Sequence, residues 1–154
     1  MLRVKALDHV GLKVRDLDQT LSFYRRLGLA VLRTKGPDTD GLRSAVIQVG
    51  MQELNVFCDP GCVSAREDNA AGIDHFCFEV DAASIDDVIA DLRQTGIEVV
   101  RGPTKRRDGS ALLLNDPDGI RVELQLKNRL TSGVGAGEYD TSTRHEGGEW
   151  TPER

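Results

Sequence analysis

A segment that occurs twice constrains the fold of this chain more than any other feature of its sequence. LDHVGLKVRD at 7–16 is matched by IDHFCFEVDA at 73–82, and both copies place an Asp-His pair before an alternating run. A pattern of apolar residues at helical spacing follows each copy and ends at a glycine, Gly28 in the first and Gly96 in the second. Such a repeat predicts two similar units that share one core.

Each unit is predicted to have the element order βαβββ. The strands after the helices are expected near 29–33, 43–49 and 52–58 in the first unit and near 97–101, 110–115 and 120–126 in the second. NDPDGIR at 115–121 is typical of a tight turn, because Pro117 presets φ and Gly119 tolerates a positive φ. TKRRDG at 104–109 is expected to be a loop, either a solvated one or one that binds an anionic substrate.

The repeat divides the chain into four parts. These are a first module at 5–58, a linker at 59–72, a second module at 73–127 and a polar C-terminal tail at 128–154. The tail is rich in Gly, Thr and Glu without periodicity, which is typical of a flexible segment. Tyr139 and Trp150 are its candidate anchors for docking on a subunit.

Composition and charge exclude several classes of partner. The 154 residues include 20 Lys and Arg against 25 Asp and Glu, and no basic block is dense enough to follow a nucleic-acid backbone. No apolar run approaches the roughly 20 residues that span a bilayer, and the first residues lack the apolar core of a signal peptide. We therefore expect a cytoplasmic protein that binds neither nucleic acid nor membrane, with its three cysteines as free thiols.

The alternating runs indicate which face of each sheet is polar. Side chains alternate across a strand, so His9 and His75 lie on the faces opposite the apolar residues of their strands. The 68-residue spacing between the two glycines relates Glu123 to Asn55 on the same polar faces. We expect these four side chains to meet, because two imidazoles and a carboxylate suit a divalent metal ion with open positions for water or substrate.

At these residues the chain resembles the vicinal oxygen chelate superfamily, which includes glyoxalase I, extradiol dioxygenases and bleomycin resistance proteins. The resemblance covers about 5–127 and lies in LDHVGLKVRDLDQTLSFYRRLGL, GIDHFCFEV and NDPDGIRVELQ. It implies an α+β fold in which paired βαβββ modules form a half-open mixed β-barrel with helices on the outer face. It also implies one divalent metal ion, Fe, Ni, Co, Zn or Mn, that captures two adjacent oxygens of a small-molecule substrate.

The resemblance places His9, His75 and Glu123 at metal-ligand positions. The fourth position falls on Asn55, where relatives have a carboxylate or an amide. Glu53, two residues earlier on the same face, is the alternative ligand. Because a carboxylate beside the metal can also move a substrate proton, Glu123 and Glu53 are the candidate catalytic groups.

Two basic residues are candidate substrate contacts. Lys13 occupies a position that resembles a basic substrate-carboxylate contact of glyoxalase I. Arg121 lies on the polar face of the last strand and is related to Glu53 by the repeat. A cross-strand ion pair between Glu53 and Arg121 is therefore an alternative to a free Glu53.

Three functions fit these residues. The favoured one is a glyoxalase- or epimerase-like lyase or isomerase, in which Glu123 or Glu53 moves the substrate proton. The second is an Fe(II) extradiol-type ring-cleaving dioxygenase, which would use the two His and one carboxylate. The third is a drug- or metabolite-binding resistance protein. The resemblance also implies a homodimer, in which each barrel is closed within one chain or by exchange of modules between two chains.

Overall fold

The structure is a computed structural model that describes residues 4–59, 61–62 and 72–128. Most of the expected linker lies outside these residues. The same holds for the tail beyond 128, including the candidate anchors Tyr139 and Trp150.

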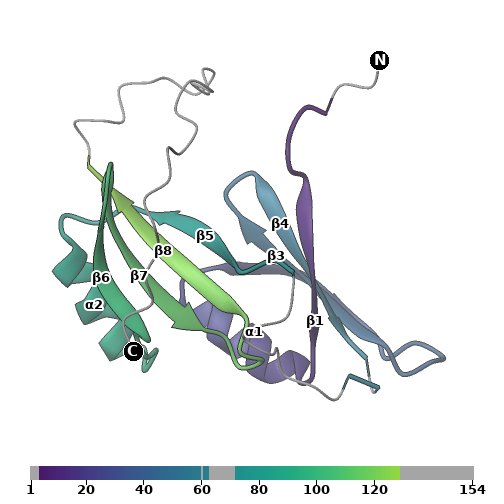
Figure 1. The fold of residues 1–154 in the computed structure, drawn as a ribbon. Helices are drawn as coiled ribbons and strands as arrows, with labels where there is room; N and C mark the ends of the chain where they lie inside the picture. The colour runs from purple at the N-terminus through teal and green to yellow at the C-terminus, as the bar shows by residue number, and fades with distance from the viewer. Residues whose placement is uncertain (1–3, 60, 63–71, 129–154) are drawn as a thin grey trace.

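The described chain has the element order βαβββ twice (Figure 1). The first module contains β1 (His9–Val14), α1 (Leu17–Arg26), β2 (Ala30–Lys35), β3 (Arg43–Val49) and β4 (Gln52–Cys58). The second contains β5 (His75–Val80), α2 (Ile85–Gln94), β6 (Arg101–Arg106), β7 (Gly109–Asn115) and β8 (Arg121–Lys127). Each module forms a four-stranded mixed sheet, in the orders β1-β4-β3-β2 and β5-β8-β7-β6. The predicted α+β fold with open, paired modules is confirmed.

Local chemistry sets both ends of the helices. Asp16 and Ser84 are the N-caps of α1 and α2, and the side chain of each accepts a hydrogen bond from a backbone N–H in the first turn. After the helices, Gly28 has a φ of 86° and Gly96 a φ of 70°, a region that favours glycine, so both predicted stops are confirmed. In the described part of the chain, no helix is long and apolar enough to cross a membrane.

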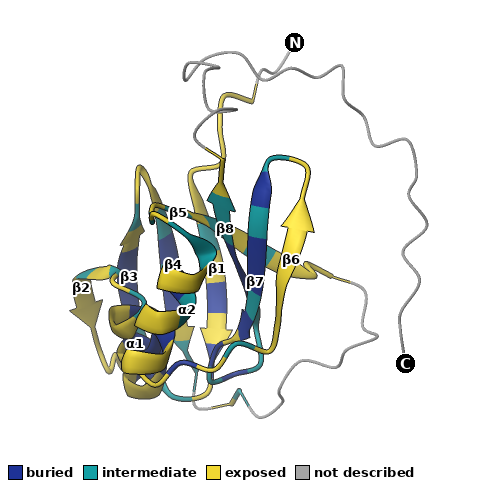
Figure 2. Ribbon diagram, turned by 90° about the vertical axis from the view of Figure 1, so that its left-hand side faces the viewer, coloured by how far each residue is buried: buried dark blue, intermediate teal, exposed yellow. Residues whose placement is uncertain are grey.

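The core lies between the apolar faces of the sheets and the two helices. Alternate residues of β4 are buried, whereas β3 and β7 also bury adjacent residues, and all three strands carry dark bands in Figure 2. One continuous apolar cluster joins both modules and includes Leu12, Leu17, Tyr24, Ile47, Val56, Leu92, Leu112 and Leu124. Since these side chains occupy one face of each sheet, the other face is left to polar residues.

The prediction for the start of β6 was wrong. Of the expected strand at 97–101, only Arg101 lies in β6: Ile97 is buried in the core, and Val100 donates its backbone N–H to Leu113 of β7 just before the strand begins. The first half of the tract 104–109, expected to be a loop, belongs to β6, which continues to Arg106 before a turn at 107–108 leads into β7. Strand pairing with β7 therefore overrides the polar composition of this segment.

The tight turn at 116–119 is confirmed, and it also joins the two modules. The backbone N–H of Asp116 donates to the carbonyl of Ile120, and Gly119 has a φ of 78°. Asp118 Oδ1 accepts hydrogen bonds from the backbone N (3.1 Å) and Nε (2.7 Å) of Arg15, in the first module. The hydroxyl of Tyr24 in α1 donates to Asp116 Oδ2 at 3.3 Å. This turn thus fixes α1 against the second sheet.

The buried carboxyl of Asp116 predicts a pH-dependent stability. Burial raises its pKa from 3.8 to about 6, so the folded state holds this proton more tightly than the unfolded state does. The group therefore stabilises the fold most at low pH, and its contribution falls as pH rises through 6, by on the order of 2 kcal/mol. The advantage of wild type over Asp116→Asn in free energy of unfolding should be larger at pH 4.5 than at pH 7.5. Urea unfolding in the presence of a chelator measures this difference, and a pH-independent difference would contradict the prediction.

Candidate functional site

His75 and Glu123 meet on the polar face of the second sheet. His75 begins β5, and Glu123 lies in β8, which pairs with β5 in parallel. The Nε2 atom of His75 is 3.4 Å from Oε2 of Glu123, and the glutamate is only 8% exposed. A buried carboxylate beside an imidazole nitrogen can act as a pair of metal ligands or transfer a proton.

Asp74 orients the ring of His75. Its Oδ2 is 2.8 Å from Nδ1 of His75, and its Oδ1 is 2.7 Å from Nη1 of Arg121. The hydrogen bond with His75, and then the charge of Arg121, lower the pKa of Asp74. With Nδ1 engaged by a carboxylate, Nε2 is the ring nitrogen available as a ligand.

His9 repeats this arrangement in the first module. Its Nδ1 is 2.7 Å from Oδ1 of Asp8, so the repeated Asp-His pair has the same geometry in both copies. In the register of β1 and β4, His9 is the partner of Glu53. Both residues line a pocket of about 500 Å³ to which Phe76 and Cys77 of the second module also contribute.

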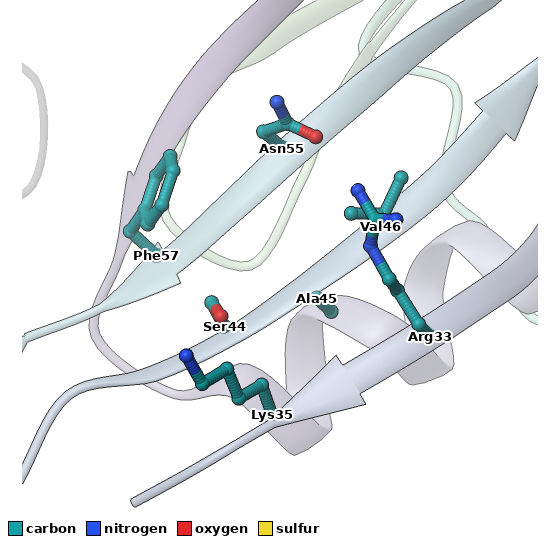
Figure 3. A pocket seen from close by; sticks show the side chains of 7 residues that line it. All are labelled: Arg33, Lys35, Ser44, Ala45, Val46, Asn55 and Phe57. Atoms are coloured by element: carbon teal, nitrogen blue, oxygen red, sulfur yellow. The ribbon is translucent and has the colours of Figure 1, made fainter. Parts of the chain in front are cut away.

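Asn55 lies one step along the same face, in the middle of the first sheet. Its Oδ1 atom is buried and forms no hydrogen bond with any residue that the structure describes. A buried oxygen without a partner is costly, so it marks a position where a ligand or metal can be accommodated. Asn55 lines a pocket together with Arg33, Lys35 and Phe57 (Figure 3).

The four candidate ligands do not form one cluster within the described chain. His75 and Glu123 lie on the second sheet, whereas His9 and Asn55 lie on the first. Among the described residues, no group of three or more His, Cys, Asp or Glu side chains is arranged to hold a metal ion. One chain therefore presents two partial sites.

The alternative ion pair between Glu53 and Arg121 was wrong. The two residues belong to different sheets, because β4 pairs with β1 and β3, while β8 pairs with β5 and β7. Glu53 is the cross-strand partner of His9, and Arg121 is that of His75. Arg121 instead supports the carboxylate that holds His75.

Arg106 is a site residue that was not predicted individually, although its tract 104–109 was a candidate for binding an anionic substrate. Its Nη2 donates to Oε2 of Glu123 at 2.9 Å, and it lines a pocket of about 750 Å³ with His75, Arg121 and Glu123. It was missed because its segment was expected to be a loop. The cysteine opposite Glu123, Cys77, has its pKa raised to about 11 by burial and by the charge of Glu123.

Lys13 lies on β1, in the register position opposite Phe57 and four residues beyond His9. It is exposed. All three cysteines are free thiols, as predicted.

Comparison with known proteins gives a consistent result. Residues 6–124 match the family model for the Glyoxalase/Bleomycin resistance protein/Dioxygenase superfamily. The chain is 30% identical over 132 residues to the glyoxalase domain-containing protein RDO1 of Mycosarcoma maydis, covering 80% of this chain and 69% of the relative. It is 29% identical over 134 residues to the lactoylglutathione lyase of Salmonella typhimurium, and the match covers 82% of this chain and 96% of that relative.

The same fold is found in a solved structure. The crystal structure of a glyoxalase family protein from Enterococcus faecalis superposes with a TM-score of 0.67 at 28% identity. The match covers 79% of this chain and 97% of the other protein. The paired βαβββ arrangement is therefore shared over nearly the whole described chain.

Proposed function

The chain belongs to the Glyoxalase/Bleomycin resistance protein/Dioxygenase superfamily, and on this premise we propose that it is a metal-dependent lyase or isomerase for a small substrate with two adjacent oxygens. The observation that carries the proposal is the pairing of His75 with Glu123: Asp74 engages Nδ1 of His75, and Nε2 lies 3.4 Å from Oε2 of the buried glutamate. Relatives named lactoylglutathione lyase support the reaction class.

The residues of the site fit a divalent metal ion. Carboxylates engage Nδ1 of both histidines, which leaves Nε2 of His9 and of His75 as nitrogen ligands. Glu123 supplies a buried carboxylate oxygen, and Asn55 an amide oxygen that lacks a partner. Nitrogen and oxygen donors of this kind suit Fe, Mn, Ni, Co and Zn.

Each residue then has a defined part in the reaction. The metal, when bound, supplies Lewis-acid polarisation of the two substrate oxygens. His9, His75 and Glu123 would hold it, with Asn55 as the fourth ligand. Glu53, the cross-strand partner of His9, is placed on the same face to take a proton from the substrate and return it.

We further propose that two chains complete each site. Each chain carries His9 with Asn55 on one sheet and His75 with Glu123 on the other, and neither set alone provides three protein ligands. A homodimer in which the first sheet of one chain faces the second sheet of its partner would join the two sets twice. Closed twofold symmetry is the commonest arrangement for such assemblies.

Proton exchange with solvent is the direct test of the reaction class. The metal-loaded protein is expected to catalyse exchange of the substrate's α-proton in deuterated water, equally well with and without oxygen. Lactoylglutathione, the compound in the names of these relatives, is the first substrate to examine. A requirement for both Fe(II) and oxygen, with ring cleavage of catechols, would contradict the lyase or isomerase assignment.

Removal of the carboxylate behind His75 should weaken metal binding without removing a ligand. Asp74→Ala is expected to lower metal affinity by about tenfold, the lower end of the range for such supporting groups, because Asp74 is largely exposed. Asp74→Asn, which retains an acceptor for Nδ1–H, should fall between this variant and wild type. Competition with a chromogenic chelator measures the affinities, and equal values for Asp74→Ala and wild type would rule out this supporting role.

A further inference from the structure

We propose that the polar face of the first sheet contains a subsite for an oxyanion carried on an apolar or aromatic body, with Arg33 and Lys35 as its cationic groups. A pocket of about 220 Å³ lies over β2, β3 and β4 and is lined by Arg33, Lys35, Ser44, Ala45, Val46, Asn55 and Phe57. The claim that this anion is part of the substrate rests on the proposed function. The claim that the pocket binds an anion is independent of it.

A β-bulge directs both basic side chains into this pocket. Val31 pairs with Ile47, but Arg33 pairs with Val46, so Leu32 is an extra residue in β2. If the register continued unbroken from Val31, Leu32 would pair with Val46, and Arg33 would pair with Ala45 and share its apolar face. With it, Arg33 and Lys35 stand on the polar face, and Figure 3 shows both on the same side of the sheet as Asn55 and Phe57.

The charge of this pocket is not balanced by the protein. Its lining contains two cations and no carboxylate. Within the described residues neither Arg33 nor Lys35 forms an ion pair, in contrast to Arg106 in the second module, which is neutralised by Glu123 at 2.9 Å. A concave, positively charged surface of this kind attracts anions of matching size.

The other lining groups define the rest of the ligand. Ser44 pairs with Lys35 across the strands and adds a hydroxyl, so the two offer hydrogen bonds to one oxyanion. Phe57, the partner of Ser44 in β4, is 38% exposed beside these polar groups, where an apolar or aromatic group can cover it. In the metal-free protein, Oδ1 of Asn55, which has no hydrogen-bond partner among the described residues, can accept a hydrogen bond from the same ligand.

The register also places this subsite relative to the candidate metal ligands. Arg33, Val46 and Asn55 form one row across the sheet. Glu53 and its partner His9 lie on the next row, two residues or about 7 Å from the row of Arg33 and four residues or about 13 Å from the row of Lys35 and Ser44. The inferred substrate is therefore an acid whose oxyanion is separated from its two chelating oxygens by a spacer that spans one to two of these rows.

Calorimetric titration of the metal-free full-length protein with phenyl phosphate, benzoate and inorganic phosphate tests the subsite. Arg33→Gln/Lys35→Gln is expected to weaken phenyl phosphate binding at least about tenfold, the effect of losing a charge-assisted hydrogen bond. Arg25→Gln/Arg93→Gln removes the same charge from the two helices and should change the affinity less than about twofold. Whichever of phenyl phosphate and benzoate binds more tightly identifies the anion as phosphate-like or carboxylate.

Two further variants test the apolar part of the subsite and its independence from the metal ligands. Phe57→Ala should weaken phenyl phosphate but not inorganic phosphate, and circular dichroism verifies that each variant is folded. His75→Ala should bind the anion as wild type does, so loss of the metal site and loss of the subsite are distinguishable. Equal weakening in both double variants would overturn the proposal in favour of a net-charge effect. Unchanged affinity in Arg33→Gln/Lys35→Gln would also overturn it and leave these residues as charges that protect the edge strand β2.

Discussion

His75→Ala is expected to lose its bound metal and to lower turnover by at least about a thousandfold. Nε2 of His75 is the nitrogen that faces buried Glu123, and Nδ1 is held by Asp74. Removal of a metal that stabilises developing charge raises the activation free energy by several kcal/mol, and an increase of about 4 kcal/mol lowers turnover about a thousandfold. Elemental analysis by mass spectrometry and the solvent-exchange assay measure the two effects.

A matched histidine variant controls for this result. His145→Ala removes an imidazole outside both repeated segments and should keep wild-type metal content and turnover. Normal metal content in His75→Ala would contradict its assignment as a ligand. Turnover that survives complete removal of metal from wild type would contradict metal-dependent catalysis.

Asp118→Ala is expected to produce the largest loss of stability, on the order of 2 to 3 kcal/mol in free energy of unfolding. The carboxylate is 7% exposed, and its Oδ1 is 2.7 Å from Nε of Arg15 across the junction between modules. Thr20 Oγ1 is 3.4 Å from its other oxygen. Loss of one partner of a buried pair costs several kcal/mol, and the exposure of Arg15 reduces this value.

Chemical denaturation of both single variants and the double variant measures the coupling between Arg15 and Asp118. Arg15→Ala should lower the free energy of unfolding by less than Asp118→Ala does. The double variant should lower it by less than the sum of the two single effects, because the two residues interact directly. Asp86→Ala, at the exposed start of α2, is the control for loss of a carboxylate. Additive effects of Arg15→Ala and Asp118→Ala would rule out this junction as a coupled contact.

The sequence predicts those parts of the fold that short-range chemistry determines. Asp16 and Gly28 mark the ends of α1, and the NDPDG segment marks the turn before β8, because each needs a particular side chain or φ at a particular position. Alternation assigns His75 and Glu123 to one polar face, and the structure places them 3.4 Å apart. Pairing of histidine with glutamate could therefore be predicted from the repeat alone.

Other features depend on how strands pair, which short-range patterns do not contain. The bulge at Leu32 reverses which face Arg33 and Lys35 occupy, and alternation alone cannot locate it. The charged segment that ends at Arg106 becomes an edge strand because β7 is there to pair with it. Whether His9 meets Glu123 depends on how the two sheets face each other, within one chain or between two.

Purified heterodimers of differently tagged chains test the split metal site most directly. When one chain carries His9→Ala and the other His75→Ala, exchange of modules leaves one site with both histidines and one with neither. The heterodimer should then contain about one equivalent of metal, whereas homodimers of either variant contain none.

A second heterodimer gives the reciprocal result. It pairs a wild-type chain with one that carries both His9→Ala and His75→Ala, so every split site lacks one histidine and metal should be absent. The reverse pattern, with metal in this second heterodimer and none in the first, would contradict the account and place each complete site within a single chain.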